Sequence, residues 1–349
     1  MLRVAIIGAG TISRSHLKAY QQCGDAEVVA IADLNEATAK AQAEQYQIPK
    51  YCCDYHELLN DASIDAVSIV TPGFTHGTIV KEALLAGKHV LCEKPPCISG
   101  KEAAECAALA EQTGKLLMWA MVCRFTKEVR FLKDYIDAGN MGHIYYAEAG
   151  RVSRCNKIGG WFVNKEKSGG GMLIDGAIHE LDQALYLMGY PKVKMVSGFT
   201  SHANQNLPDT IKGMGAGYRS MDTRKYERTV ETMASGYVHF ENGACLYVKA
   251  AYVMHSVLAG SWVDITGEKA GARSDGTGLR VVTAQNDYLM DNKPVLTDNT
   301  DVFEAEINHF VDCCINGTPC ICPAWHGAEL MKIISAIYES AETGMPVYL

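Results

Sequence analysis

The chain has 349 residues, a length typical of two domains, and its 48% hydrophobic and 21% charged residues exclude bulk disorder. Forty acidic residues against 32 basic ones give a net charge of −8, and no run of Lys or Arg forms the basic face of a nucleic-acid-binding protein. No apolar stretch reaches the roughly 20 residues of a membrane helix, and the N-terminus has no signal-peptide pattern. We therefore expect a cytoplasmic protein that binds neither nucleic acid nor membrane.

The thirteen cysteines are an odd number in a chain too large to depend on a disulfide framework. Cys52-Cys53 and Cys313-Cys314 are adjacent pairs, and one residue separates Cys320 from Cys322. No two CxxC pairs stand at zinc-finger spacing. These patterns favour reduced core or surface thiols over a metal site.

The first 120 residues alternate between short β-rich runs and helical stretches, as in a parallel sheet with helices on both faces. The apolar run Leu2–Ile7 leads into Gly8-Ala9-Gly10-Thr11-Ile12-Ser13, and a helical pattern follows to about Gln22. A second strand, Glu27–Ala32, ends at Asp33, twenty residues beyond Ser13. This order predicts a doubly wound Rossmann domain over residues 1–122.

The glycine turn fits a dinucleotide. Gly8 permits the tight turn, and Gly10 allows the backbone to approach a pyrophosphate beside Thr11, Ile12 and the N-terminus of the following helix. Asp33 would accept hydrogen bonds from both ribose hydroxyls and repel a 2′-phosphate, which favours NAD over NADP. The alternative is a glycine turn in a sheet that binds no ligand.

Two later strands also lead into polar loops. Ala66–Val70 is followed by Thr71-Pro72-Gly73-Phe74-Thr75-His76, and His89–Cys92 by Glu93-Lys94-Pro95-Pro96. Ligands of parallel sheets bind outside the carboxyl ends of the strands, so we expect both loops to face the nicotinamide. The cofactor-binding candidates here are Thr71, Pro72, His76, Glu93 and Lys94. Lys94 is also an acid–base candidate, although a solvated turn residue is the alternative for it, and a simple helix start is the alternative for His76.

A strand over Ile144–Ser153 and a glycine-rich stretch containing Trp161 precede a predicted helix from Met172 to Met188. On this helix Asp175, His179 and Asp182 stand at i, i+4 and i+7 among apolar neighbours. A solvated stripe, a two-ligand metal site and an acid–base site with Asp182 orienting His179 are the three interpretations.

The rest of the chain is rich in strands. Alternation predicts strands over 195–201, 236–240, 244–253, 261–267 and 280–284, with a hairpin turn at Glu241-Asn242-Gly243. Two amphipathic helices, about Val302–Ile315 and Trp325–Glu342, close the chain. The long polar segment 202–229 is expected to reach a substrate pocket or a neighbouring subunit. Residues 123–349 are thus predicted to form an α/β domain with an open, mostly antiparallel sheet.

Taken in order, GAGTIS, Asp33, TPGFTH, CEKPP and GGGMLIDGAIHELD resemble the Gfo/Idh/MocA oxidoreductases. The resemblance covers nearly the whole chain. It implies a Rossmann domain followed by an α/β domain whose sheet forms homodimers or homotetramers. It also implies an NAD-dependent dehydrogenase that acts on a secondary hydroxyl of a sugar, glycoside or cyclitol.

The same resemblance implies catalytic and substrate-binding roles for Lys94, Asp175 and His179. His179 would take the hydroxyl proton, Lys94 would stabilise the developing alkoxide, and Asp175 would bind a neighbouring hydroxyl; whether Lys94 or His179 is the base is left open. Arg124 is a further cofactor candidate, at a place where related chains contact cofactor or substrate. Trp161 is a sugar-stacking candidate, with a core or interface tryptophan as the alternative. Val230-Glu231-Thr232 stands where related chains often read Val-Glu-Asp.

Two other functions remain as alternatives. A glycosidase or lyase would keep NAD bound, oxidise C3 of its substrate, eliminate the aglycone and return the hydride. A non-catalytic sensor would bind NAD and control a partner, but it would not need Lys94, Asp175 and His179 together.

Overall fold

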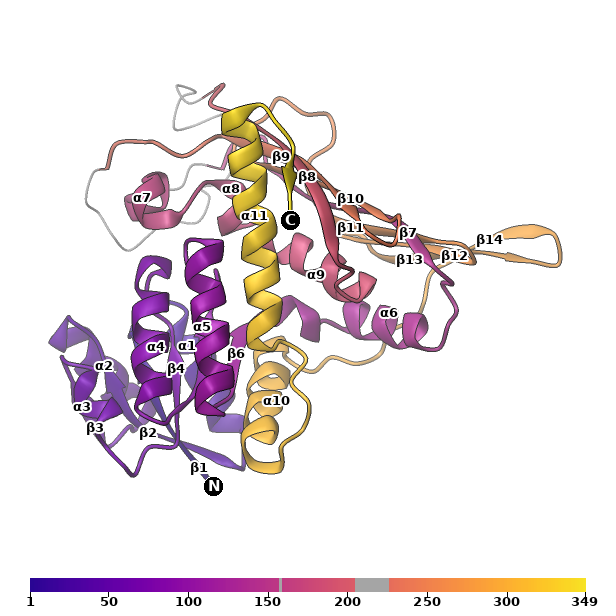
Figure 1. Cartoon of the computed structure of the whole chain (residues 1–349). Helices are drawn as coiled ribbons and strands as arrows, with labels where there is room; N and C mark the ends of the chain where they lie inside the picture. The colour runs from indigo at the N-terminus through magenta and orange to yellow at the C-terminus, as the bar shows by residue number, and fades with distance from the viewer. Residues whose placement is uncertain (157–158, 205–225) are drawn as a thin grey trace. The chain divides into compact units, whose positions relative to one another are not determined.

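The computed structural model describes residues 1–156, 159–204 and 226–349, which form two compact units (Figure 1). The first unit comprises Met1–Phe125 and Thr300–Met331, and the second comprises Thr126–Asn299 and Lys332–Leu349. The predicted boundary between two domains, at residues 122/123, stays a prediction. In the structure the chain returns to the first unit after residue 299. No helix in the described part of the chain has the length and apolar character needed to span a bilayer.

The first unit is built on a parallel six-stranded sheet in the order β3-β2-β1-β4-β5-β6. This arrangement places the point at which the strand order reverses between β1 and β4, as in dinucleotide-binding folds. The predicted Rossmann topology is confirmed. Its strands are β1 (Leu2–Ile7), β2 (Ala26–Ala32), β3 (Lys50–Cys52), β4 (Ala66–Ile69), β5 (His89–Glu93) and β6 (Leu117–Ala120).

Helices cover this sheet, and α10 from near the C-terminus packs against both α1 and β1. The apolar face of that late helix therefore completes the core of the first unit, around strands such as β1 and β4 whose side chains are almost all buried. The helices are α1 (Ser13–Gln22), α2 (Glu36–Tyr46), α3 (His56–Leu59), η1 (Gly73–Thr75), α4 (His76–Leu85), α5 (Gly100–Thr113), η2 (Val122–Phe125) and α10 (Val302–Asn316).

The second unit contains a nine-stranded sheet in the order β14-β13-β12-β11-β7-β10-β9-β8-β15. Only the β10–β7 pair is parallel among the pairings described, so the predicted mostly antiparallel sheet is confirmed. The strands are β7 (Ile144–Val152), β8 (Val193–Ser201), β9 (Met233–Phe240), β10 (Cys245–Ala251), β11 (Gly260–Gly267), β12 (Ala270–Asp275), β13 (Gly278–Gln285), β14 (Tyr288–Asn292) and β15 (Val347–Tyr348).

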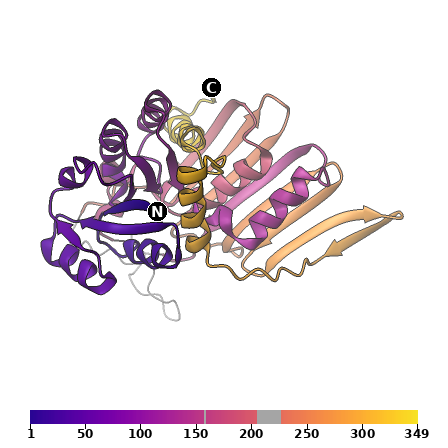
Figure 2. The same cartoon turned by 90° about the horizontal axis from the view of Figure 1, so that it is seen from below.

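The predicted hairpin between β9 and β10 is confirmed. Gly243 has φ +86°, and the amide of Phe240 donates to the Ala244 carbonyl at 2.9 Å. The strands β13 and β14 form a second hairpin at the sheet edge, which Figure 2 shows in orange extending away from the other strands of this unit.

The helices of the second unit are α6 (Lys127–Asp137), η3 (Gly160–Val163), α7 (Lys165–Ser168), α8 (Met172–Asp175) and α9 (Ile178–Met188), and α11 (Ala324–Thr343) contributes its later residues. The prediction of one helix from Met172 to Met188 was wrong. The Met172 carbonyl accepts from both the Gly176 and the Ala177 amides, which ends α8 before α9 begins. Glycine favours such an end because it gains little from helical geometry.

Candidate active site

The turn after β1 has the geometry that a dinucleotide requires. Gly8 has φ +107°, and a Cβ there would lie 2.8 Å from the Val70 carbonyl oxygen, so a larger residue would be strained and crowded. A Cβ at Gly10 would meet no protein atom within 4 Å, which leaves the backbone open to a ligand. Ser13, in the third glycine position, is buried and donates its hydroxyl to the Gly10 carbonyl at 2.7 Å. Its small side chain therefore tightens the turn.

The N-terminus of α1 completes this cradle. Ile12 occupies the N-cap position and has no polar side chain with which to cap the helix. The first amides of α1 and the positive end of its dipole are therefore suited to a pyrophosphate beside Thr11 and Ile12.

Asp33 directly follows β2, and two backbone amides donate to its carboxylate. Its Oδ2 accepts from the Ala9 amide at 2.8 Å, and its Oδ1 accepts from the Asn35 amide at 2.8 Å. A carboxylate can accept about four hydrogen bonds, so each oxygen keeps capacity for a ribose hydroxyl. The glycine turn, the helix N-terminus and this carboxylate together fit NAD.

The loops after β4 and β5 are joined by His76. Its ring is buried, with Nδ1 2.9 Å from the Pro95 carbonyl and Nε2 2.8 Å from the Thr71 carbonyl. Burial lowers the pKa of His76, although the two carbonyl contacts oppose that effect. A neutral ring can donate to only one of these oxygens at a time. The structure thus shows His76 holding two loops together, and its predicted contact with the cofactor stays a prediction.

Glu93 lies directly before Lys94, and each oxygen of its carboxylate has a hydrogen-bond partner. Its Oε1 is 3.1 Å from His16 Nε2, and its Oε2 accepts from the Lys94 amide at 3.1 Å. Burial alone would raise the pKa of Glu93, but His16 and Lys94 outweigh it and hold that pKa below its usual value. This ionised carboxylate orders the backbone of Lys94, whose own side chain is partly exposed.

Behind Glu93, the carboxyl group of Glu306 on α10 is fully buried, and neither of its oxygens has a hydrogen-bond partner among the described residues. Burial, followed by the charge on Glu93, raises the pKa of Glu306 well above its usual value. The fold therefore favours the protonated form of this carboxyl group. Sequence reasoning missed this residue because the position reads as one polar residue in an amphipathic helix.

Arg124, on η2, is almost completely buried within the first unit. Its guanidinium donates to the Ile321 carbonyl and lies 2.8 Å from His326 Nδ1. Burial, followed by the Arg124 charge, lowers the pKa of His326 to about 3. Arg124 is thus a fixed part of this unit, and its predicted cofactor contact is untested by these contacts.

In the second unit, Asp175 is the last residue of α8 and His179 is the second residue of α9. These two side chains are partly exposed, whereas all the remaining residues from Gly171 to Leu185 are buried. The adjacent Glu180 is buried and holds α9 to β7 through a bidentate pair with Arg151, at 2.6 and 2.9 Å. Asp182, predicted to orient His179, accepts from the Tyr190 hydroxyl at 3.1 Å.

The buried residues Tyr252 and Glu231 and the partly exposed Tyr338 support this region, and sequence reasoning did not select them as site residues. Tyr252 follows β10 and donates its hydroxyl to Asp175 Oδ2 at 2.7 Å. Glu231 accepts from the Gly171 amide with both oxygens, at 2.9 and 3.0 Å, and from the Tyr338 hydroxyl at 2.8 Å. These contacts join residues that are far apart in the sequence, so no local spacing of residues predicts them.

Glu231 also explains the glycine directly before α8. A Cβ at Gly171 would lie 2.5 Å from the Glu231 carbonyl oxygen, so only glycine fits there. At the unusual Thr232 position, the hydroxyl lies 2.5 Å from the Ala203 carbonyl and 3.0 Å from the Ser201 carbonyl and can donate to either, which an ionised aspartate cannot do.

Trp161 lies on η3, where it is partly exposed and stacks on Phe162 with ring centroids 3.9 Å apart. A flat, partly exposed ring could pack on a sugar face. Most of the polar segment 202–229, predicted to reach a pocket or a second subunit, lies outside the described residues, which stop at 204 and resume at 226.

Comparison with known proteins gives two family matches that together span almost the entire chain. Residues 2–121 match the NAD-binding Rossmann fold of the Gfo/Idh/MocA oxidoreductase family, and residues 133–349 match its C-terminal α/β domain. These matches identify the first unit's sheet as that of an NAD-binding domain.

Two characterised relatives align along nearly their full lengths. D-glucoside 3-dehydrogenase of Escherichia coli is 34% identical, with 100% of this chain and 97% of that protein covered. The NAD-dependent scyllo-inositol 2-dehydrogenase of Bacillus subtilis is 28% identical, with coverage of 100% and 96%.

Among solved structures, levoglucosan dehydrogenase in complex with NADH superposes with a TM-score of 0.85 at 23% identity, covering 99% of this chain and 98% of that one. This likeness confirms the fold of the chain.

Proposed function

The chain belongs to the Gfo/Idh/MocA oxidoreductase family, and from this premise we propose that it is an NAD-dependent dehydrogenase of a sugar, glycoside or cyclitol. The observation that carries the proposal is the partial exposure of Asp175 and His179 along an otherwise buried segment. Polar side chains that stay partly exposed on an otherwise buried segment are accessible to a small polar ligand. A polyol supplies the several hydroxyl groups that such side chains bind.

We assign the acid–base chemistry to His179 and Lys94 on the resemblance to the family. His179 takes the proton of the hydroxyl that is oxidised, because imidazole exchanges protons readily near neutral pH. Lys94 donates a hydrogen bond to the same oxygen and stabilises its developing negative charge. NAD, when bound, supplies the hydride acceptor.

Asp175 is assigned the task of positioning. Its carboxylate, held by Tyr252, accepts a hydrogen bond from a hydroxyl next to the reacting carbon. This choice of neighbour determines which carbon is oxidised. Trp161 is a candidate platform for the ring of the substrate.

For NAD binding we assign a set of residues around the carboxyl ends of the strands. Gly8 and Gly10 provide the backbone approach and Asp33 the ribose contact, as argued above. The remaining members of the set are Thr11, Ile12, Thr71, Pro72, His76, Glu93, Lys94 and Arg124.

We also propose that the chain forms a homodimer or homotetramer through the sheet of the second unit and that it works in the cytoplasm. Supporting the first point, the aromatic residues Tyr146, Tyr237, Tyr247 and Trp262 are not fully buried in that sheet. Aromatic side chains are enriched at protein interfaces. Light scattering on the purified protein, with Tyr237→Arg as the disrupting variant, tests the assembly.

The substrate class is suggested by the relatives, two of which are named for the oxidation of a glucoside at C3 and of an inositol at C2. We therefore expect a glucoside with a free C3 hydroxyl to be among the substrates. The test mixes protein, excess NAD and a panel of glucosides, hexoses and cyclitols, and follows NADH absorbance. More than one NADH per chain establishes a dehydrogenase with exchangeable cofactor.

The same assay separates the alternatives. A glycosidase or lyase that retains NAD would release aglycone without net NADH, and a sensor would give neither product. Lys94→Ala should lose turnover, while NAD binding, measured by calorimetry, should still be detected because the other residues of the set remain. Unchanged turnover in that variant would remove Lys94 from the mechanism.

A further inference from the structure

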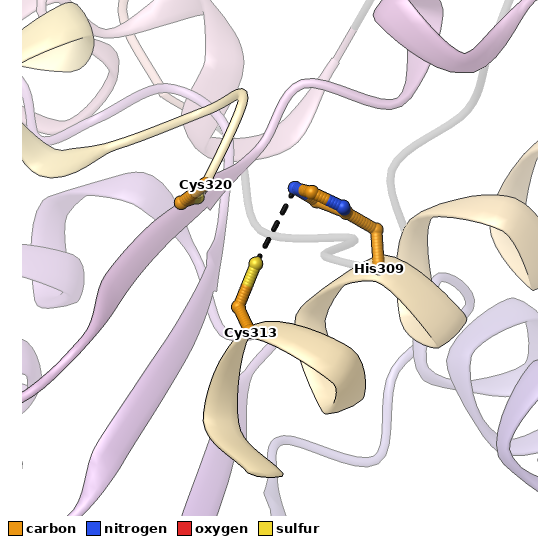
Figure 3. A group of neighbouring side chains, drawn as sticks. All are labelled: His309, Cys313 and Cys320. Carbon is orange, nitrogen blue, oxygen red and sulfur yellow. Dashed lines mark hydrogen bonds between the residues drawn. The ribbon is translucent and has the colours of Figure 1, made fainter. Parts of the chain in front are cut away.

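Three thiol and imidazole groups converge in the first unit, away from the glycine turn and the Lys94 loop in sequence. His309 and Cys313 stand one helical turn apart on α10, and Cys320 lies on the loop that follows this helix. Figure 3 shows the His309 ring and the Cys313 side chain directed toward one another, with Cys320 beside them. The Nε2 of His309 and the two sulfurs all lie within 4.8 Å of one another.

The fold holds this group in place from two sides. Gly317, with φ +70°, ends α10 and turns the chain back toward the helix. The Ile321 amide then donates to His309 Nε2 at 3.1 Å, and the Trp119 amide on β6 donates to the Cys322 carbonyl at 3.1 Å. The cluster therefore sits between a helix and a loop that is anchored to the sheet.

The distances suit a tetrahedral metal centre. Bond lengths of about 2.3 Å to sulfur and 2.0–2.1 Å to nitrogen place the two donors about 3.5 Å apart at a tetrahedral angle. The distance from His309 Nε2 to Cys313 Sγ is 3.4 Å. The second sulfur is near enough to complete the set with a small side-chain rotation. One imidazole with two thiolates is a donor set that favours Zn²⁺ over Mg²⁺ or Ca²⁺.

We propose that His309, Cys313 and Cys320 bind one thiophilic divalent cation of the zinc class, with a water molecule as the fourth ligand. Binding forms two metal–sulfur bonds and one metal–nitrogen bond, and protons carried by the two thiols pass to solvent. The two thiolates neutralise the charge of the cation. The Ile321 amide donates to His309 Nε2 when no metal is bound. Because the metal takes the lone pair of that nitrogen, this amide must then donate to a thiolate sulfur.

The consequence is structural. The cation joins α10 to the loop that leads into α11, and it uses no residue assigned above to NAD or substrate. The proposal is thus independent of the dehydrogenase assignment. We expect saturating Zn²⁺ to raise the thermal midpoint of the protein by a few degrees, because a ligand that binds only the folded state stabilises it.

A disulfide between Cys313 and Cys320 is the competing use of this cluster. The two sulfurs already lie within 4.8 Å of one another, so a side-chain rotation could bring them to bonding distance. An experiment on the cluster must therefore separate a metal from an oxidised pair.

The test uses the full chain, stripped with a chelator and kept reduced, and titrates it with Co²⁺ without oxygen. We expect one equivalent to produce a thiolate-to-cobalt charge-transfer band and the visible bands of a tetrahedral ion, which Zn²⁺ then displaces. Cys313→Ser and Cys320→Ser should each lose the charge-transfer intensity and weaken binding by at least about tenfold. Cys314→Ser, next to the cluster on the same helix, should retain both.

Far-UV circular dichroism and NAD binding establish that each variant is folded. No charge-transfer band in the folded wild-type protein would overturn the proposal, as would a band that persists unchanged in both serine variants. Thiol alkylation and peptide mapping of freshly isolated protein provide the second readout. A Cys313–Cys320 disulfide in that protein, together with no Co²⁺ binding once the disulfide has been reduced, would assign the cluster to redox chemistry and overturn the metal site.

Discussion

The Tyr252 hydroxyl donates a hydrogen bond to Asp175 Oδ2 over 2.7 Å, and this contact joins residues 77 positions apart. Tyr252 is only 1% exposed. Burial, followed by the Asp175 charge, raises the pKa of Tyr252 well above its usual value. The hydroxyl therefore stays protonated throughout the working pH range and always donates. This bond thus helps to fix the orientation of the Asp175 carboxylate.

Tyr252→Phe should lower kcat/KM for the substrate by about tenfold while leaving NAD binding unchanged. A hydrogen bond to a charged group contributes about 1.5–3 kcal/mol, and tenfold corresponds to about 1.4 kcal/mol. Steady-state kinetics at saturating NAD measure the effect. The matched control is Tyr190→Phe, which removes a similar tyrosine–aspartate bond to Asp182, outside the proposed set. Equal losses in the two variants would show a general effect on folding rather than positioning of Asp175.

Glu231 should contribute to stability chiefly through the groups that it satisfies. Glu231→Ala leaves the Gly171 amide and the Tyr338 hydroxyl without their acceptor, at an expected cost of about 2–4 kcal/mol in the free energy of unfolding. Glu231→Gln keeps one carbonyl oxygen and should cost less. Urea unfolding of both variants checks the order. If glutamine destabilised the fold as much as alanine, charge rather than hydrogen bonding would be the property that matters.

The first half of the site was predictable because its parts are close in sequence. The glycine turn, α1 and Asp33 occupy one short stretch, and the physics of a dinucleotide fixes their spacing. Fold class followed for a similar reason, since the alternation of strands and helices restricts the topology.

The hydrogen bond from Tyr252 to Asp175 could not be predicted from local sequence patterns. Tyr252 is one aromatic residue after a strand, and nothing in its neighbourhood points to a partner 77 residues away. The break at Gly176 was missed because apolar periodicity continues across it, and the doubled acceptance by the Met172 carbonyl is visible only in the fold. Likewise, periodicity predicts α10 as a helix but not which sheet it covers.

Asp33 should set the cofactor preference through its charge. Asp33→Asn keeps an oxygen acceptor for the Ala9 amide but removes the repulsion of a 2′-phosphate. Two unit charges about 4 Å apart near a protein surface interact by about 4 kcal/mol, so the NAD-to-NADP ratio of kcat/KM should fall about tenfold or more. The ratio is measured with both cofactors at one substrate concentration. Asp25→Asn, an exposed aspartate of the same unit, is the control and should leave the ratio unchanged.

Glu306 should make the protein less stable as the pH rises. Its pKa is raised in the fold, whereas the unfolded chain releases this proton above a pKa of about 4.5. The folded state therefore binds more protons than the unfolded state above that pH, and the free energy of unfolding falls until the pKa of the folded state is reached.

Glu306→Gln removes this dependence, so the stability of the variant relative to wild type should increase from pH 5 to pH 8. The slope is at most about 1.4 kcal/mol per pH unit, and it vanishes above the pKa of Glu306 in the folded state. Urea unfolding at both pH values provides the comparison. The control is Glu111→Gln, an exposed carboxylate on α5. Parallel wild-type and Glu306→Gln profiles would mean that Glu306 ionises in the fold as it does in the unfolded chain, and that the charge on Glu93 does not act on it.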